Sequence, residues 1–319
     1  MSHEVETMFS VREKPWHYEL TKDYTKILQE APNSSEALIA AGLNWHVVPK
    51  EISLLGDDKA IPNAVANVRD SDGKVFGVVT SRYQIVQNDE AFAFTDTLLG
   101  GGVRYETAGS LFGGKKVWLL AKISDTKILG DNVEQYLCFT NTHDGTGSVR
   151  VMVTPVRVVC NNTLNLAVRE AKRAWSVRHV GDINAKIKAA QEALGMANSY
   201  MQKLAEDAER YADIKIDYEQ TRHYLKSIFG DPDKAKSERE KNCIANSFFQ
   251  YEIAYHSPDI KQFRGTGWGA INAMADMVDH ATPNRLSKTY AENNWGRIMN
   301  GHADLDAFVE MIEAGVNVA

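Results

Sequence analysis

The sequence predicts an α+β protein, in which an antiparallel β-meander with flanking helices is followed by a mostly helical C-terminal half. Four β-rich runs between about residues 103 and 160 are separated by short glycine-containing turns, which is typical of an antiparallel meander. A helical period of apolar residues begins after Asn161-Asn162-Thr163. Between Ile183 and Tyr211 the apolar residues keep alternating spacings of four and three, an unbroken heptad pattern.

These patterns divide the chain into three expected regions. The regions are an N-terminal arm with a short helix (1–60), an α+β core with a basic face (61–180), and a helical region (181–319) that includes a long heptad-patterned helix (182–211). In the arm, Asn33 and the two serines after it offer N-cap chemistry, and Gly42 follows the apolar segment. We therefore expect the short helix between these residues.

Within the core, turn and cap residues locate the elements. The segment Asp70-Ser71-Asp72-Gly73 separates two β-rich runs and predicts a hairpin turn, in which the glycine supplies the positive φ. The segment 88–99 predicts a helix with Asn88 or Asp89 as its N-cap and with glycines that end it. The last β-rich run contains Pro155, which favours an edge position or a bulge because proline cannot donate to a β-ladder.

The charge of the chain is unevenly distributed. The whole chain has a net charge of −6, whereas residues 148–179 carry six basic residues against one acid, Glu170. This stretch therefore has a net charge of +5, which leaves −11 for the rest of the chain. A local positive field on an acidic protein favours a polyanionic partner.

Other features of the sequence exclude several classes of protein. No segment has the run of about 18 apolar residues that a membrane span needs, and the first residues lack the apolar core of a secretory signal. The three cysteines are too few and too scattered for a disulfide framework. We expect a cytoplasmic protein with no membrane partner.

No catalytic motif in the sequence is complete. Residues 109–115 resemble a phosphate-binding P-loop, but Lys116 stands where the motif needs Ser or Thr, and a strand follows instead of a helix. Asp276 and His280 share a helix face, with more candidate metal ligands at His302, Asp304 and Asp306, yet no recognised metal motif is present. Cys160 stands at the end of an apolar run, where a cysteine usually behaves as a small buried apolar residue and not as a nucleophile. We predict no catalytic residue, metal or cofactor.

Nucleic-acid binding is the function that the basic stretch predicts. Its cations begin on a predicted strand and continue on a predicted helix, and Trp175 stands among them, where a planar ring can stack an unpaired base. Such an arrangement suits single strands better than a duplex groove. The residues expected to contact phosphates are Arg150, Arg157, Arg169, Lys172, Arg173 and Arg178, with Lys115 and Lys116 as secondary contacts.

Several segments together resemble a family of phage- or plasmid-like proteins, the domain-of-unknown-function family 932. The similarity lies in TSRYQIVQNDEAF, ETAGSLFGGKKVWLLAKI, TPVRVVCNNTLNLAV and GTGWGAINAMADMVDH, which span about residues 77–281. The resemblance implies an intracellular protein of a mobile element, in the host cytoplasm if it is phage-encoded, and brings no catalytic residues. A looser architectural similarity to the single-strand annealing proteins of phage recombination implies assembly into homo-oligomers along a DNA strand.

Two alternatives to nucleic-acid binding stay open at this point. The heptad pattern at 183–211 is typical of either an internal helical hairpin or an intermolecular coiled coil. In the second case the chain is an oligomeric interaction factor that acts on a host or defence component. A metal-dependent hydrolase built on Asp276, His280 and His302 is the weaker alternative.

Overall fold

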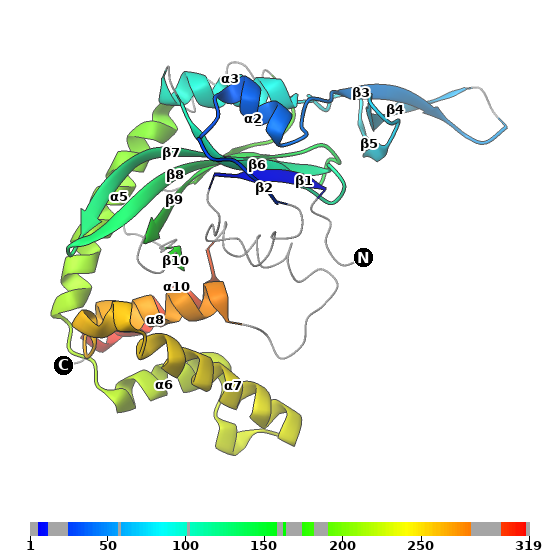
Figure 1. Ribbon diagram of the computed structural model, residues 1–319. Coiled ribbons are helices and arrows are strands. Elements are labelled where there is room, and N and C mark those ends of the chain that lie inside the picture. The colour runs from blue at the N-terminus through cyan, green and yellow to red at the C-terminus, as the bar shows by residue number, and fades with distance from the viewer. Residues whose placement is uncertain are drawn as a thin grey trace. The chain divides into compact units, whose positions relative to one another are not determined.

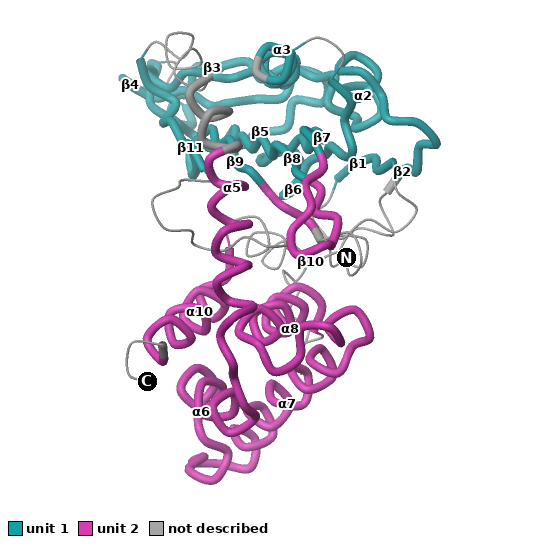
Figure 2. Tube along the Cα trace, turned by 90° about the vertical axis from the view of Figure 1, so that its left-hand side faces the viewer, with its two compact units in different colours: residues 1–124, 135–153, 172–198 teal, residues 125–134, 154–171, 199–319 magenta. Residues whose placement is uncertain are grey.

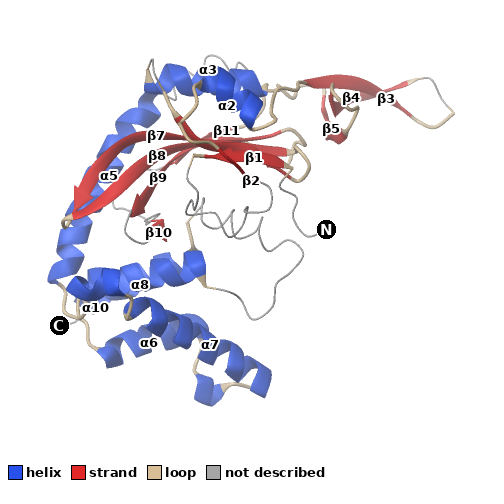
Figure 3. Ribbon diagram, in the orientation of Figure 1, coloured by secondary structure: helices blue, strands red, loops and turns tan. Residues whose placement is uncertain are grey.

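The structure, a computed structural model, describes residues 6–11, 25–56, 59–100, 103–157, 162–163, 174–181, 191–281 and 301–316. Its strands are β1 (Thr7–Ser10), β2 (Thr25–Ile27), β3 (Val47–Ser53), β4 (Ala60–Arg69), β5 (Val75–Thr80), β6 (Tyr105–Leu111), β7 (Lys116–Ile128), β8 (Asp131–Thr142), β9 (Val149–Arg157), β10 (Asn162–Thr163) and β11 (Ala174–Val177). Its α-helices are α2 (Ser34–Ala40), α3 (Asn88–Leu99), α5 (Gln191–Asp213), α6 (Tyr218–Phe229), α7 (Glu238–Tyr255), α8 (Gly267–His280) and α10 (Ala303–Val316). Strands dominate the first half and helices the second (Figure 3), which confirms the predicted α+β class.

In the described part of the chain, eight strands form a large sheet and three form a small one. The large sheet has the order β10-β9-β8-β7-β6-β1-β2, with β11 also paired to β9 (Figure 1). Strands β6 to β9 are sequential neighbours, so the predicted meander is confirmed. Pro155 lies between the part of β9 that pairs with β11 and the part that pairs with β10, which fits a residue that cannot donate to a ladder.

The small sheet has the order β3-β4-β5. Its β4–β5 connection is the predicted hairpin, and Gly73 has a φ of 73° there, a conformation that side chains other than glycine rarely adopt. The sequence did not predict that residues 47–53 pair with β4 and make a separate sheet, because β3 contains a proline and exposed polar residues and lacks a clear alternation.

The N-terminal residues are more regular than the arm expected from the sequence. Strand β1 pairs with β6 and with β2, the latter in parallel. This pairing needs a glycine at position 109, because a Cβ there would lie 2.5 Å from the Cβ of Met8. Before β1, Glu6 accepts hydrogen bonds from the buried Arg69 guanidinium at 2.7 and 2.8 Å, which ties the segment to β4.

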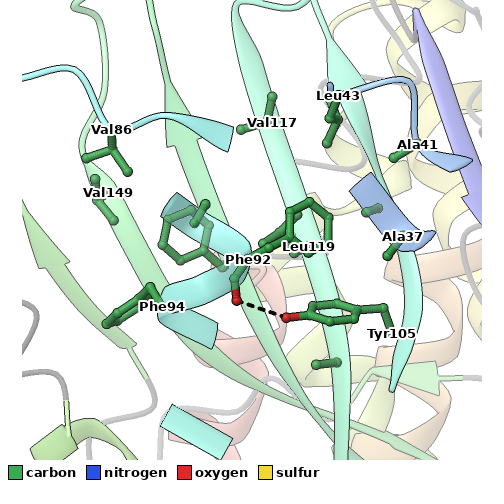
Figure 4. Packing of buried hydrophobic residues seen from close by; sticks show 14 of the residues in the cluster. Ala37, Ala41, Leu43, Val86, Phe92, Phe94, Tyr105, Val117, Leu119 and Val149 are labelled. Atoms are coloured by element: carbon green, nitrogen blue, oxygen red, sulfur yellow. Dashed lines mark hydrogen bonds between the residues drawn. The ribbon is translucent and has the colours of Figure 1, made fainter. Parts of the chain in front are cut away.

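Helices α2 and α3 cover one face of the large sheet (Figure 1), and their apolar residues join those of the strands in one cluster. Figure 4 shows Phe92 and Phe94 of α3 against Val117, Leu119 and Val149 of the strands. The Tyr105 hydroxyl donates to the carbonyl of Phe92 at 3.2 Å and to Asp96 at 2.8 Å. Burying these side chains supplies most of the stability of this half, at roughly 1.5–3 kcal/mol for each large apolar side chain.

The predicted helix at 88–99 has the bounds of α3, but its N-cap differs from the prediction. The cap is Gln87, whose main-chain N–H donates to Glu90 Oε2 at 2.8 Å. The predicted caps were wrong because the Asn88 side chain is drawn into the interior, where it donates to the carbonyl of Leu43 at 3.0 Å. The short helix α2 starts as expected, with Asn33 as its N-cap in a capping box.

The chain forms two compact units, shown in Figure 2. Unit 1 consists of residues 1–124, 135–153 and 172–198, and unit 2 of residues 125–134, 154–171 and 199–319. Unit 1 thus takes in the expected arm together with most of the expected core. In unit 2, helix α8 is buried along residues 267–275 and contacts α7 and α10.

The described half of the heptad seam is buried within unit 2. Met201, Leu204, Ala208 and Tyr211 are at most 3% exposed. The Tyr211 hydroxyl donates to Glu313 of α10 at 2.8 Å, so the end of α5 packs against another helix of the same chain. These four residues therefore pack inside their own chain, and their side chains offer no surface for a coiled coil with a second copy.

We predict that Leu204→Ala lowers the free energy of unfolding by about 2–5 kcal/mol, because it leaves a cavity beside α5. Thermal and urea unfolding of the wild type and the variant at one protein concentration measure this loss. Ile253→Ala, at a side chain that is 54% exposed in the same unit, is the control, with a change within about 0.5 kcal/mol. A loss as small as that of the control would contradict the burial of Leu204 in the interior.

Candidate nucleic-acid interface

Several turns meet at one end of the large sheet, all of them within unit 1. The β6–β7 turn lies beside the β8–β9 loop, because the His143 N–H donates to the carbonyl of Lys115 at 2.7 Å. Strand β11 also ends there, since Val177 pairs with Val149 at the start of β9. We call this region the basic end and define it by Lys115, Lys116, Arg150 and Arg178. All four are residues that the sequence predicted as phosphate contacts.

The strand register assigns the residues of β9 and β11 to two faces. Arg150 pairs with Ser176, so these two side chains share a face, and Arg178 follows Ser176 by two positions. Trp175 pairs with Val151 and packs, half-buried, against the hydrophobic cluster on the opposite face. The helix expected to carry Trp175 is a strand at residues 174–177, because alternate apolar residues there cover the core.

The basic end brings two cations within range of mutual repulsion. Burial lowers the pKa of Lys116, and the positive charge of Arg150 lowers it further, while Cys138 and Asp144 act in the opposite direction. Lys116 starts β7 and Arg150 lies on β9, with β8 between them in the sheet. Cations gathered at one end of a sheet create a local positive field that attracts an anion.

A pocket of about 600 Å³ opens at the basic end. It is lined by Tyr83, Gly145, Thr146, Gly147, Ser148, Ser176, Arg178, His179 and Val180. Arg178 is the charged residue of this lining, and its exposed guanidinium has no partner among the described residues. A larger hollow of about 980 Å³ beside α2 is lined by two basic residues, Lys26 and Arg104, and two acids, Glu30 and Glu36. Of these two pockets, the smaller one has a net positive lining.

The loop that borders this pocket is held by its own aspartate. Asp144 accepts hydrogen bonds from the N–H and the hydroxyl of Thr146 at 2.9 and 2.7 Å. The main-chain N–H groups of Gly145 and Gly147 have no hydrogen-bond acceptor within the described residues. They are donors of the kind that bind anions in glycine-rich loops.

Two stacked rings form the other wall of the pocket. The ring centroids of Tyr83 and His179 are 4.5 Å apart with an interplanar angle of 15°. His179 is 3% exposed and its Nδ1 lies 2.9 Å from the carbonyl of Gln84, so Nδ1 carries the proton and donates. Burial lowers the pKa of His179, which keeps the ring neutral and makes Nε2 an acceptor. Within the described residues, this buried Nε2 has no hydrogen-bond partner.

His143 fixes the start of the loop. Its Nε2 lies 3.2 Å from Asn88 Oδ1, and because the Asn88 amide nitrogen already donates to a carbonyl, Nε2 is the donor. The His143 carbonyl accepts from Asn67 Nδ2 at 2.8 Å. Burial and the nearby His179 lower the pKa of His143 to about 3, so the imidazole is neutral at pH 7.

The remaining predicted contacts are only partly described. Arg157 lies on β9, where its main chain pairs with Asn162. Arg169, Lys172 and Arg173 lie outside the described residues, as does Cys160. The charge count did not identify Tyr83 and His179, which reach the site from distant segments, or Lys74, whose ammonium occupies the space next to Gly113.

The alternatives considered from the sequence gain no support at their sites. Of the P-loop-like glycines, Gly109 lies within β6, whereas Gly113 and Gly114 form the β6–β7 turn and lead into a strand, so they offer no helix N-terminus to a phosphate. Asp276 and His280 make a 3.9 Å pair, and His302 and Asp304 a 3.5 Å pair. Within the described residues, no three potential ligands come together as a metal site would require.

Comparisons with known proteins give one match. The family model described as Domain of unknown function (DUF932) matches residues 75–297, which is more than half of the 319-residue chain. This match confirms the family resemblance seen in the sequence motifs. No curated protein and no solved structure matches the chain significantly. In the described residues no helix has both the length and the apolar character needed to cross a bilayer.

The neutral His143 predicts acid sensitivity. Its pKa is about 3 in the folded protein and 6.5 in a model peptide, so only the unfolded state takes up this proton as the pH falls below about 6.5. The free energy of unfolding should then fall between pH 6.5 and 3, by at most about 1.4 kcal/mol per pH unit for this one proton. Urea unfolding from pH 7.5 to 4 measures the slope.

His143→Gln should reduce the slope of the free energy of unfolding against pH by up to about 1.4 kcal/mol per pH unit, the contribution of one proton. This change in slope does not depend on how the variant alters the stability at pH 7. His223→Gln, at an exposed histidine of α6, is the matched control and should keep the wild-type slope. An unchanged slope in His143→Gln would show that His143 is protonated in the folded protein.

Proposed function

Because the chain belongs to the family described as a domain of unknown function (DUF932), its activity has to be argued from its own residues, and we propose that it binds single-stranded nucleic acid without sequence preference. DNA is the favoured strand, and the binding needs no catalytic residue and no cofactor. The wider proposal, which rests on the sequence resemblances alone, is a homo-oligomeric phage or plasmid protein that supports strand annealing or recombination in the cytoplasm.

The observation that carries this proposal is that the turns and strand ends bearing Lys115, Lys116, Arg150 and Arg178 meet at one end of the large sheet. Lysine and arginine side chains that neutralise phosphates supply most of the affinity in sequence-independent binding of nucleic acids. Arg178 adds an exposed positive charge at the same end of the sheet. The net charge of the chain is −6, so this local field is not a consequence of a generally basic surface.

The shape of the basic end favours a single strand. It is built from strand ends and turns, with an aromatic pair in its pocket, as suits unpaired bases that stack on side chains. Duplex DNA is commonly read by a helix in the major groove, and none of the four cations lies on a described helix. Lys115 and Lys116 extend the positive surface to the β6–β7 turn.

The alternative of an oligomeric interaction factor depended on the heptad seam. Its described half is buried within unit 2, so that part of the seam supplies no docking surface. An acidic protein partner for the basic end is the outcome that the binding test must separate from a nucleic acid.

We predict salt-dependent binding of a labelled single-stranded oligonucleotide, measured by fluorescence anisotropy. Four phosphate contacts give a slope of about −2.8 in a plot of log affinity against log salt, or about a 50-fold loss from 50 to 200 mM. The double variant Lys116→Gln/Arg150→Gln should reduce the slope to about −1.4, because two contacts are lost. Arg169→Glu/Arg173→Glu tests the predicted contacts outside the described residues.

The matched control is Lys26→Gln/Arg104→Gln, which removes the same charge from exposed positions of unit 1 that line the hollow beside α2. Circular dichroism verifies that each variant is folded. A folded wild type that binds no oligonucleotide at low salt, or binds with a flat salt plot, contradicts the proposal. An equal loss in the control pair would mean that net charge, and not the basic end, governs binding.

A further inference from the structure

We propose that the pocket beside Arg178 is a nucleotide subsite, in which Arg178 contacts a phosphate and the base lies against the stacked rings of Tyr83 and His179. This inference rests on the proposed function and deepens it, because it assigns the base-stacking role to Tyr83. The sequence had assigned that role to Trp175, whose ring packs against the hydrophobic cluster.

The pocket has the size and the charge that a nucleotide needs. Its volume of about 600 Å³ lies within the roughly 300–1,000 Å³ of small-molecule sites. Arg178 supplies a guanidinium with no other partner among the described residues, and a phosphate oxygen can accept two hydrogen bonds from its planar fork. The free N–H groups of Gly145 and Gly147 lie on the same lining.

The aromatic wall is already arranged for stacking. Tyr83 is partly exposed and lines the pocket, and two contacts fix the orientation of its ring. His179 covers one ring face, and the hydroxyl donates to the carbonyl of Thr142 at 2.6 Å. A base that stacks on Tyr83 therefore meets a ring that has little rotamer freedom left to lose.

His179 adds to the wall of the pocket a polar feature that is independent of charge. Its Nε2 finds no hydrogen-bond partner in the part of the chain that the structure describes, and His179 is 3% exposed. An unpaired buried polar atom costs free energy. The missing partner is a hydrogen-bond donor.

The tyrosine is tested with an oligonucleotide that carries one 2-aminopurine, whose fluorescence is quenched when it stacks on an aromatic ring. We expect wild type to quench the probe and Tyr83→Leu to abolish the quenching. The same variant should weaken affinity about 5- to 150-fold, the range for stacking one base. Tyr83→Phe keeps the ring and loses only the hydrogen bond to Thr142, so it should keep both the quenching and most of the affinity.

The arginine is tested by Arg178→Gln, a change at an exposed side chain that should not disturb folding. We expect a weaker affinity and a salt slope smaller by about 0.7, the value for one phosphate. Arg104→Gln is the control and should change neither quantity. If Tyr83→Leu does not fold, Arg178→Gln alone decides whether the pocket contacts the strand.

The outcomes separate this inference from the function on which it rests. Salt-dependent binding that falls in Lys116→Gln/Arg150→Gln but is unchanged in Tyr83→Leu and Arg178→Gln overturns the subsite and leaves the function standing. Binding of adenosine monophosphate, but of no oligonucleotide, with loss in both pocket variants keeps the subsite and overturns the function. Inorganic phosphate that binds as tightly as the mononucleotide overturns the stacking role of Tyr83.

Discussion

The arrangement of unit 1 depends on the hydrogen bonds and ring contacts of His143. Its main chain binds Lys115 of the β6–β7 turn and Asn67 of the small sheet, and its side chain binds Asn88 at the start of α3. The imidazole also contacts the rings of Trp45 and Phe76, with centroids 5.4 and 5.6 Å away. One neutral side chain thereby joins both sheets, a helix and the loop that borders the pocket. A charged imidazole at this position would have to be desolvated, which is why its pKa is so low.

The parts of the fold that the sequence predicted are those with strong local signals. Helix α3 has the predicted bounds, and the hairpin at Gly73 has the predicted turn, because turn and helix-end residues mark their limits. Strand β1 was missed, since four residues give no period and their pairing depends on Gly109 in a distant strand. Strand β11 was missed because a dense run of cations obscured the alternation of Trp175 and Val177.

For the candidate site, too, the sequence predicted local features but not the contacts between distant segments. Counting charges found cations that the structure brings together, because Arg150 and Arg178 fall near each other in a hairpin-like pairing of β9 with β11. It did not separate the two faces of the sheet, so it placed Trp175 with the cations. Tyr83 and His179 carry no signal in the sequence, since their stacking depends on bringing together segments that are far apart in the chain.

The division of the chain into units has a consequence for how this protein can evolve. The chain passes between unit 1 and unit 2 five times, at residues 124, 134, 153, 171 and 198. Strands β7, β8 and β9 each contribute residues to both units. Neither unit can therefore be acquired, lost or exchanged between genes as one continuous segment. A lineage that keeps strands β7, β8 and β9 therefore keeps residues of both units. The family match, which runs from residue 75 to residue 297, likewise includes parts of both units.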